Sequence, residues 1–244
     1  MSRHALNPVN PALHVLCAGA VQGLVKALQP AFEAQTGATV QPRFGAVGTM
    51  KEALMAGAPC DVLIVTEAML RALEGNGAIE AGSAAPIGRV RTCVAARAAE
   101  PLPEVDSAAA LREALLDTPA FYVPDVLKST AGQHIAAMLD QLEVRRALGT
   151  RLMVFANGAS AMQALAERGV GGAIGCTQAT EILYTPGLVS AGALPDPFGL
   201  ATVYSAGVST TATAVALAEA FIAMLCSADK AALRANGGFE PPDA

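Results

Sequence analysis

Short apolar runs that are typical of buried strands alternate with longer, helix-like segments along almost the whole chain. Such alternation favours parallel strands that are connected and covered by helices. The sequence therefore predicts an α/β fold with mostly parallel strands. The expected strands are 13–18, 40–44, 61–65, 90–96, 120–123, 151–155, 172–175 and 200–205, and the expected helices are 21–36, 49–56, 67–75, 108–116, 131–142, 160–168, 212–226 and 229–236.

Two stretches rich in breaker residues interrupt this alternation. The first, 82–86, is built of Gly, Ser, Ala and Pro and predicts a crossover between two structural units. The second, 191–197, is again rich in Gly, Ala and Pro, and it precedes the last expected strand. With 244 residues, the chain is long enough for one large domain or for two small ones.

Small residues form the turns between two of the expected strands and the helices that follow them. Phe44-Gly-Ala-Val-Gly-Thr-Met50 opens directly into a helix, and the earlier turn Ala18-Gly-Ala-Val21 does the same. A turn of this kind presents free backbone N–H groups and the positive end of a helix dipole, which attract an anion. Two such turns on neighbouring strands can converge on one ligand. Alternatively, the small residues only close tight turns.

Charge and composition exclude several classes of function. The net charge is −5, and no cluster of Lys and Arg could follow a nucleic-acid backbone. Aromatic residues make up only 4% of the chain, so a platform for base stacking is not expected either. The sequence has no P-loop, no Gly-x-Gly-x-x-Gly turn and no Gly-x-Ser-x-Gly elbow, and its three histidines are dispersed. We therefore predict no nucleic-acid partner, no cofactor and no metal.

The cysteines and the N-terminal residues indicate in which cellular compartment the protein is expected. The five cysteines are scattered and never form a Cys-x-x-Cys pair, which is typical of reduced, buried thiols in the cytoplasm. No charged segment leads into a continuous apolar run with a cleavage site. No stretch reaches the roughly 18–20 apolar residues of a membrane span. We predict a cytoplasmic protein without membrane insertion, or a periplasmic one if a leader has been removed.

Several of these segments, taken in chain order, resemble one known family. The most specific pieces are Phe44-Gly-x-x-Gly-Thr-Met50, Gly57-Ala-Pro-x-Asp61, Ala131-Gly132 after a strand, and Phe221-(x)4-Cys-Ser227 followed by Gly238-Phe-Glu-Pro241. Together they resemble the molybdate-binding protein of bacterial ABC importers, which has a type II periplasmic-binding-protein fold. The resemblance implies two α/β lobes, 1–84 plus 200–244 against 85–199, with crossovers near 84–88 and 197–204 and a ligand cleft between the lobes.

The resemblance also implies how the cleft holds an anion, through hydroxyls and backbone N–H groups on loops at 18–21, 45–49, 157–160 and 173–177. This chain departs from that pattern. Ala20 stands where a serine is expected, and Ala46 and Val47 replace a serine pair. Cys176 takes the place of a tyrosine. Each lost hydroxyl donor costs a bound oxyanion on the order of 1–3 kcal/mol, which weighs against molybdate or tungstate.

The polar and small groups that are left suit an organic acid, because helix N-termini bind carboxylates and apolar walls contact a carbon skeleton. Ser129 and Gln178 are further polar candidates for the cleft, and Lys128 and Arg43 are the basic residues nearest to its loops. The expected ligand-binding residues are Gly19, Ala20, Val47, Gly48, Thr49, Thr130, Asn157, Ala159, Ser160 and Thr177.

The family is also similar to a bacterial aconitate isomerase. This likeness, the absent leader and the missing hydroxyls favour an isomerase that moves a proton along a small unsaturated polycarboxylate. The alternative is a solute-binding protein for a small anion, with an ABC permease as partner only if the chain is exported. The candidates near the shuttled proton are His134, Cys176 and Thr49. Packing roles for His134 and Cys176, and a capping role for Asp61, are the competing interpretations.

Overall fold

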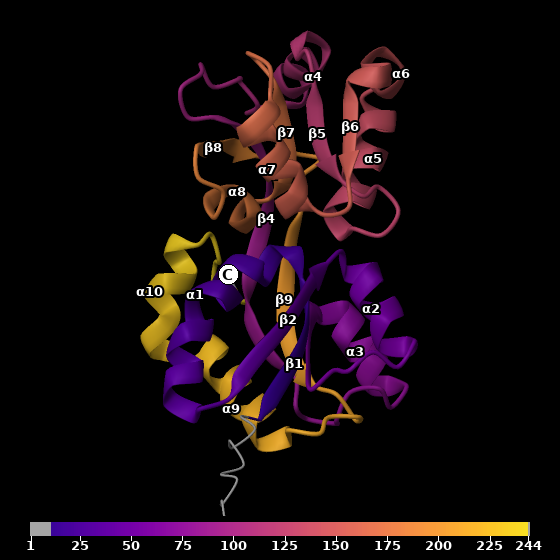
Figure 1. Ribbon diagram of the computed structural model, residues 1–244. Coiled ribbons are helices and arrows are strands. Elements are labelled where there is room, and N and C mark those ends of the chain that lie inside the picture. The colour runs from indigo at the N-terminus through magenta and orange to yellow at the C-terminus, as the bar shows by residue number, and fades with distance from the viewer. Residues whose placement is uncertain (1–10, 244) are drawn as a thin grey trace, which may run out of the picture.

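The chain folds into two lobes, one above the other in Figure 1. The computed structural model describes residues 11–243. The prediction that the chain lacks a leader rests on a segment that lies almost wholly outside the described residues. Within residues 11–243, no helix is both long enough and apolar enough to cross a bilayer. The strands form one hydrogen-bonded path in the order β2-β1-β3-β9-β4-β7-β5-β6, and β8 also pairs with β4.

The first lobe, the lower one in Figure 1, contains both ends of the described chain. Its strands are β1 (Ala12–Ala18), β2 (Thr39–Gly45), β3 (Val62–Thr66), β9 (Ala201–Val208) and the first half of β4 (Ala85–Arg97). Its helices are α1 (Gly19–Thr36), α2 (Val47–Met55), α3 (Glu67–Gly75), α9 (Val215–Cys226), the 3-10 turn η2 (Ala228–Lys230) and α10 (Ala231–Asn236).

The second lobe is built from the middle of the chain. Its sheet combines the second half of β4 with β5 (Phe121–Pro124), β6 (Leu152–Phe155), β7 (Ile174–Gln178) and β8 (Leu188–Ala193). Its helices are α4 (Ala108–Asp117), α5 (Thr130–Gln141), α6 (Arg145–Leu148), the 3-10 turn η1 (Gly149–Arg151), α7 (Gly158–Arg168) and α8 (Ala179–Leu183).

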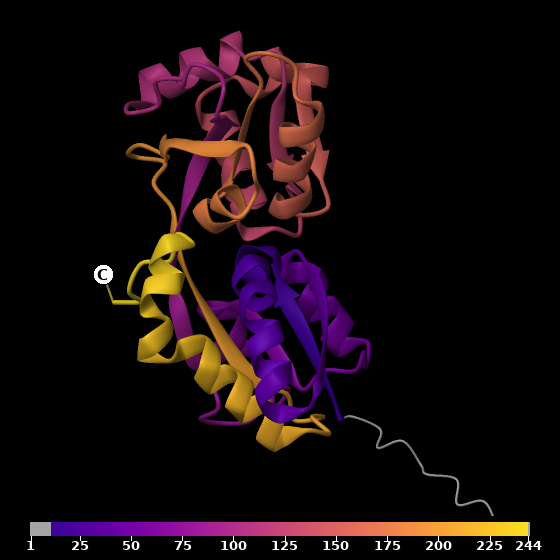
Figure 2. The same cartoon turned by 60° about the vertical axis from the view of Figure 1, so that its left-hand side comes forward.

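The long strand β4 belongs to both lobes. Its residues 85–91 pair with β9, and its residues 92–97 pair with β7 or β8. The chain returns to the first lobe beside the middle of β4. The N–H of Leu194 donates to the carbonyl of Thr92 at 3.0 Å, and the N–H of Thr92 donates to the carbonyl of Leu200 at 2.8 Å. Figure 2 shows the two connecting strands side by side along one edge of the molecule. The outward crossing thus lies near Arg91 and Thr92, later in the chain than the expected 84–88.

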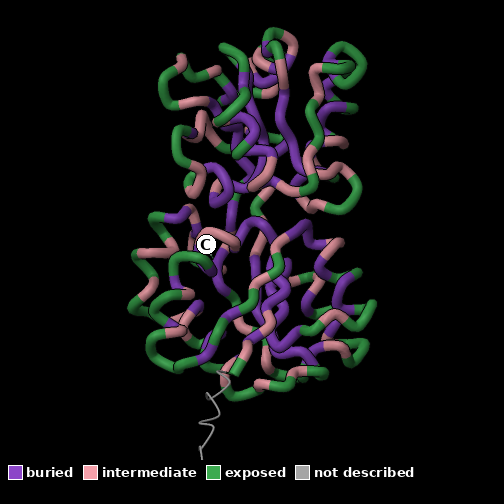
Figure 3. Tube along the Cα trace, viewed as in Figure 1, coloured by how far each residue is buried: buried purple, intermediate pink, exposed green. Residues whose placement is uncertain are grey.

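Each lobe has its own apolar interior (Figure 3). In the first lobe, α1 turns an apolar face that includes Leu24, Leu28 and Phe32 toward the sheet, at the spacing of one helical side. Phe32 meets Phe221 of α9 edge to face, with ring centroids 4.9 Å apart. In the second lobe, two clusters cover the two faces of the sheet. Alternating strand and helix patterns thus produce the expected α/β architecture.

Two features differ from the expectation. Every antiparallel pairing among the described strands involves β4 or β9, whereas mostly parallel strands were expected. These two strands run between the lobes, so their direction depends on long-range topology that local patterns do not encode. The short elements α6, α8 and β8 were not expected. Helices of four or five residues carry no usable periodicity, and β8 contains Ser190 and Gly192 instead of a continuous apolar run.

Candidate functional site

A small cavity lies between the lobes, where the N-termini of five helices meet. Helices α1 and α2 come from the first lobe, and α5, α7 and the short α8 come from the second. The cavity has a volume of ≈ 10 Å³, room for about one water molecule. Among the described residues that line it, none is Lys, Arg or His. The lining consists of Ala18, Gly19, Ala20, Gly45, Ala46, Val47, Ser129, Thr130, Asn157, Gly158, Gln178, Glu181 and Tyr204.

The two lobes offer different helix ends to this cavity. In the second lobe, Ser129 caps α5, and Asn157 caps α7 in a reciprocal capping box with Ser160. In the first lobe, the N-cap residues Ala18 and Ala46 have no side chain that could cap α1 and α2. The first-turn N–H groups of a helix have no carbonyl partner within it. Apart from the N–H of Gly48, which donates to the carbonyl of Lys128, the first turns of α1 and α2 therefore offer N–H groups without a side-chain cap, and the positive ends of two helix dipoles, to a ligand.

The structure brings part of the expected ligand set to this cavity. Gly48 is on α2, but its N–H donates to the carbonyl of Lys128 across the cleft at 3.0 Å. The Lys128 ammonium pairs with Glu52 at 2.7 Å, so it is not directed at a ligand. Thr49 and Thr177 do not line the cavity. Of the expected residues, Gly19, Ala20, Val47, Thr130 and Asn157 line the small cavity, whereas Ala159 and Ser160 line the pocket beside it.

The candidate proton-transfer residues do not line the cavity either. The Nε2 atom of His134 lies 2.8 Å from the carbonyl oxygen of Phe198, within the second lobe. Cys176 is completely buried in the apolar cluster of that lobe, and burial raises the pKa of its thiol well above the usual value. Thr49 is half-buried in the first turn of α2. These placements favour packing and structural roles for His134 and Cys176.

The acidic group that does face the cavity is Glu181, which the sequence reasoning missed. Glu181 is the third residue of α8 and is only 7% exposed. Its carboxylate accepts hydrogen bonds from the N–H of Ala159 at 3.2 Å and from the hydroxyl of Thr177. The local signal was a Glu in the first turn of a helix directly after a buried strand. Such a residue is usually read as a helix cap.

Two glycines make room for this carboxylate. A Cβ on Gly158, in the first turn of α7, would lie 1.9 Å from Oε2 of Glu181. A Cβ on Gly19, in the first turn of α1, would lie 2.4 Å from Oε1. Real Cβ atoms do not approach an oxygen so closely, so any larger residue would displace the carboxylate. Glu181 is therefore seated between helix N-termini that belong to different lobes.

Gln178 and Tyr204 are the other buried polar groups of the lining. Neither the amide nitrogen nor the amide oxygen of Gln178 has a hydrogen-bond partner, although the side chain is 2% exposed. It lies beside the hydroxyl of Tyr204 without a well-formed hydrogen bond to it. Burial and the neighbouring Glu181 carboxylate raise the pKa of Tyr204, so this phenol stays neutral and can donate. A buried amide without partners is costly and marks a place for a polar ligand atom.

A larger pocket adjoins the small cavity on the side of α1, α7 and α8. Its volume is ≈ 600 Å³, within the range of sites for small organic ligands. Gly19, Asn157 and Glu181 line both spaces, so Glu181 stands at the boundary between them. The pocket adds Gln22 and Lys26 of α1, and it could admit a molecule that the small cavity alone could not. Within residues 11–243, no group of three or more His, Cys, Asp or Glu side chains could hold a metal ion.

Burial raises the pKa of Glu181 to about 7, and the hydrogen bonds from the Thr177 hydroxyl and from the backbone N–H groups of Gln178 and Ala159 only partly offset this effect. The folded-state pKa lies above the unfolded value of 4.5. The contribution of Glu181 to the free energy of unfolding therefore decreases as the pH rises from about 4.5 to 7. We expect the free energy of unfolding of the wild type to fall over that interval by about 3 kcal/mol more than that of Glu181→Gln. Urea unfolding at a series of pH values measures the difference, and parallel curves would contradict it.

Known proteins share this architecture. The family described as bacterial extracellular solute-binding protein matches residues 13–240. The aconitate isomerase of a Pseudomonas species is 24% identical over 243 residues, which cover 97% of this chain and 90% of the relative. The periplasmic molybdate-binding protein of Azotobacter vinelandii superposes with a TM-score of 0.76 at 18% identity, covering 94% of this chain and 99% of that one. The sulfate-binding protein SubI of Mycobacterium tuberculosis H37Rv superposes with a TM-score of 0.71 at 19% identity, covering 96% of this chain and 88% of that one. The expected molybdate-binding-protein-like fold is confirmed.

Proposed function

The chain belongs to the bacterial extracellular solute-binding protein family, and from this premise we propose that its cleft binds a small unsaturated polycarboxylate of the aconitate type and isomerises it. The observation that carries the proposal is the cleft itself. The N-termini of α1 and α2, which lack a side-chain cap, line the same cavity as a buried carboxyl group, and alanine and valine stand where hydroxyl donors for an oxyanion were expected. Such a site provides donors for substrate carboxylates together with a group that can exchange a proton.

The chemistry of an allylic isomerisation matches these features. Removing a proton from the carbon beside a carboxylate leaves negative charge that spreads over the allyl system and onto carboxylate oxygens. Helix N-termini that already point at those oxygens stabilise this charge without having to reorganise. The cleft needs no metal for such a step, because the proton moves between two carbon atoms of one molecule. The full-length likeness to a protein named aconitate isomerase supports the same substrate class.

The alternative is that the chain only binds a small anion and delivers it to an ABC permease. The family supports this reading, and the structural neighbours include molybdate- and sulfate-binding proteins. It requires export, whereas a cytoplasmic location stays a prediction from the sequence. An inorganic oxyanion would also have to bind without the hydroxyls that are missing at Ala20 and Ala46.

Thermal unfolding with candidate ligands tests the binding part of the proposal. The panel is cis-aconitate, trans-aconitate, citrate, molybdate, tungstate and sulfate. We expect the aconitates to stabilise the fold, by about 2.7 kcal/mol at a hundredfold excess over Kd, and the inorganic oxyanions to have little effect. Stabilisation by molybdate alone would contradict the proposed ligand class.

Proton NMR tests the catalytic part. Pure protein is incubated with cis-aconitate in D2O, and the expected result is growth of the trans isomer together with deuterium at the allylic carbon. Buffer without protein controls for spontaneous isomerisation. Binding of aconitate without either change would leave a binding protein and would refute the isomerase.

A further inference from the structure

Any isomerisation in this cleft requires a group that accepts a proton and returns it. Among the described residues that line the small cavity, Glu181 and Tyr204 are the ones with side chains that titrate. Tyr204 is 2% exposed, and burial keeps it in the neutral form, so it can donate a hydrogen bond but cannot serve as a base near neutral pH. The geometry therefore leaves one candidate for the base.

We propose that Glu181 is the catalytic acid–base residue of this cleft, an inference that rests on the proposed isomerase function. In the first half of the reaction, a Glu181 oxygen takes a proton from the methylene carbon of the substrate. A C–H bond breaks, an O–H bond forms, and the electron pair spreads over the allyl system. In the second half, the O–H bond breaks and the proton is delivered to the other end of that system. A new C–H bond forms there and the double bond moves by one position. The step needs no oxidant, reductant or further reactant.

The position of Glu181 supports this role over that of a simple helix cap. A third-residue Glu normally bonds only within the first turn of its own helix. Here the carboxylate also reaches out of α8 to the N–H of Ala159 in α7, and glycines at two helix N-termini leave it space from both lobes. Glu181 lines the small cavity and also the ≈ 600 Å³ pocket, and the larger of these spaces has room for an organic ligand beside it.

Gln178 supplies the complementary part of the site. Its buried amide has unsatisfied donor and acceptor atoms, and it lines the same cavity as Glu181. The small cavity would have to widen to admit a substrate carboxylate, which would then accept from the Gln178 amide and from the Tyr204 hydroxyl. This arrangement would place the carbon next to that carboxylate close to the base. One side of the cavity would thus bind the substrate and the other would move its proton.

The ionisation of Glu181 should control the rate near neutral pH, since burial raises its pKa to about 7. Among the groups of neighbouring elements, burial raises the pKa of Tyr204 of β9 and of Cys17 of β1. The charged residues that line the adjoining pocket beside Glu181 are Lys26 of α1 and Glu167 of α7. The wild-type kcat/KM should therefore rise with pH, with a midpoint near 7.

The test compares wild type, Glu181→Gln and Glu181→Asp, with Glu219→Gln as a matched control. Glu219 is an exposed glutamate on α9 of the first lobe. The readouts are interconversion of cis- and trans-aconitate and deuterium uptake at the allylic carbon, both by NMR. Thermal stabilisation by aconitate confirms that each variant folds and binds. We expect Glu181→Gln to lose kcat by about 10²- to 10⁴-fold while aconitate still stabilises it. Glu181→Asp should keep part of the activity, and the control should match the wild type.

The outcomes separate this inference from the proposed function. A wild type that binds aconitate but exchanges no hydrogen refutes the isomerase, and the role of Glu181 with it. A wild type that turns over while Glu181→Gln stays within tenfold of it refutes the role of Glu181 alone. If Glu181→Gln fails to fold, the wild-type pH profile decides. A profile that is flat between about pH 5.5 and 8.5 would exclude a base of this kind.

Discussion

Replacing Gly132 by alanine is expected to destabilise the fold by about 3 kcal/mol or more. Gly132 is in the first turn of α5, beneath the loop that leads into this helix. A Cβ at this position would lie 2.1 Å from the carbonyl oxygen of Asp125 and 2.7 Å from its carbonyl carbon. These are backbone atoms, so no side-chain rotation can relieve the overlap. Urea unfolding of the variant measures the loss.

The matched control for that experiment is Gly171→Ala. No atom lies within 4 Å of a Cβ built on Gly171, and its backbone is not in the left-handed region. We expect its stability to stay within about 0.5 kcal/mol of the wild type. If Gly132→Ala proved as stable as this control, then the loop over α5 would be able to shift at little cost.

The Gly132→Ala substitution should weaken ligand binding in the cleft as well as destabilise the fold. The loop above Gly132 carries Lys128, whose carbonyl accepts the N–H of Gly48 from the other lobe, and Ser129, which lines the cavity. Displacing this loop would remove a contact between the lobes. A variant that still folds should therefore bind aconitate more weakly than Gly171→Ala does.

Local patterns were sufficient to predict much of this molecule. Helix α1 was expected to end at residue 36, and the next residue, Gly37, adopts a left-handed conformation, with its N–H donating to the carbonyl of Glu33 at 2.9 Å. The small-residue turns at Ala18 and Ala46 do open into helices whose N-termini border the cavity. Such features depend on a few consecutive residues, and a sequence shows them directly.

The identity of the buried carboxylate could not be predicted in this way. Glu181 is on a helix of five residues, too short for any periodic signal, and its immediate neighbours look like an ordinary helix start. Its burial depends on α1 and α7, which are distant in the sequence. Similarly, the placement of His134 away from the cavity depends on the return segment that includes Phe198. Side-chain environments of this kind come from tertiary packing.

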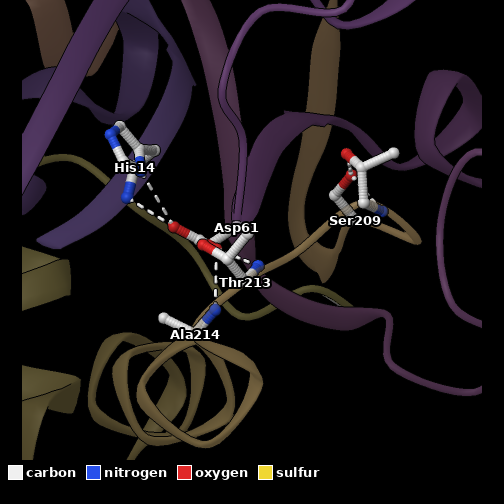
Figure 4. Close-up of polar contacts among 6 residues, drawn as sticks. His14, Asp61, Ser209, Thr213 and Ala214 are labelled. Carbon is white, nitrogen blue, oxygen red and sulfur yellow. Dashed lines mark hydrogen bonds and ion pairs between the residues drawn. The ribbon is translucent and has the colours of Figure 1, made fainter. Parts of the chain in front are cut away.

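Replacing Asp61 by asparagine is expected to cost about 3 kcal/mol of stability at pH 7. Figure 4 shows why: the buried Asp61 carboxylate joins β1, β3 and α9. It accepts from the N–H of His14 at 2.7 Å, and on its other oxygen from those of Thr213 at 2.7 Å and Ala214 at 3.0 Å. Helix α9 has no cap from its own N-cap residue, so Asp61 takes that role. An asparagine would turn an N–H of its amide toward at least one of these donors.

The pKa of Asp61 determines how the loss of stability in Asp61→Asn should depend on pH. Burial raises the pKa of Asp61, but the hydrogen bonds from His14, Ala214 and Thr213 outweigh this and hold it below the usual value. A lowered folded-state pKa contributes stability above the unfolded value of 3.8, and that contribution is lost as the pH falls through the folded pKa. The deficit of Asp61→Asn should therefore be full at pH 7 and shrink below about pH 4. Urea unfolding of the wild type and of Asp61→Asn, at pH 7 and below about pH 4, measures this deficit.

The exposed Asp106→Asn serves as the control, with an expected change within about 0.5 kcal/mol. Asp61 precedes β3, whereas the cavity borders the opposite, carboxyl-terminal ends of β1 and β2, where Ala18 and Gly45 lie. An Asp61→Asn variant that remains folded should therefore bind aconitate with unchanged affinity. A loss of affinity without a loss of stability would contradict a capping role. It would indicate instead that this end of the sheet is coupled to the cleft.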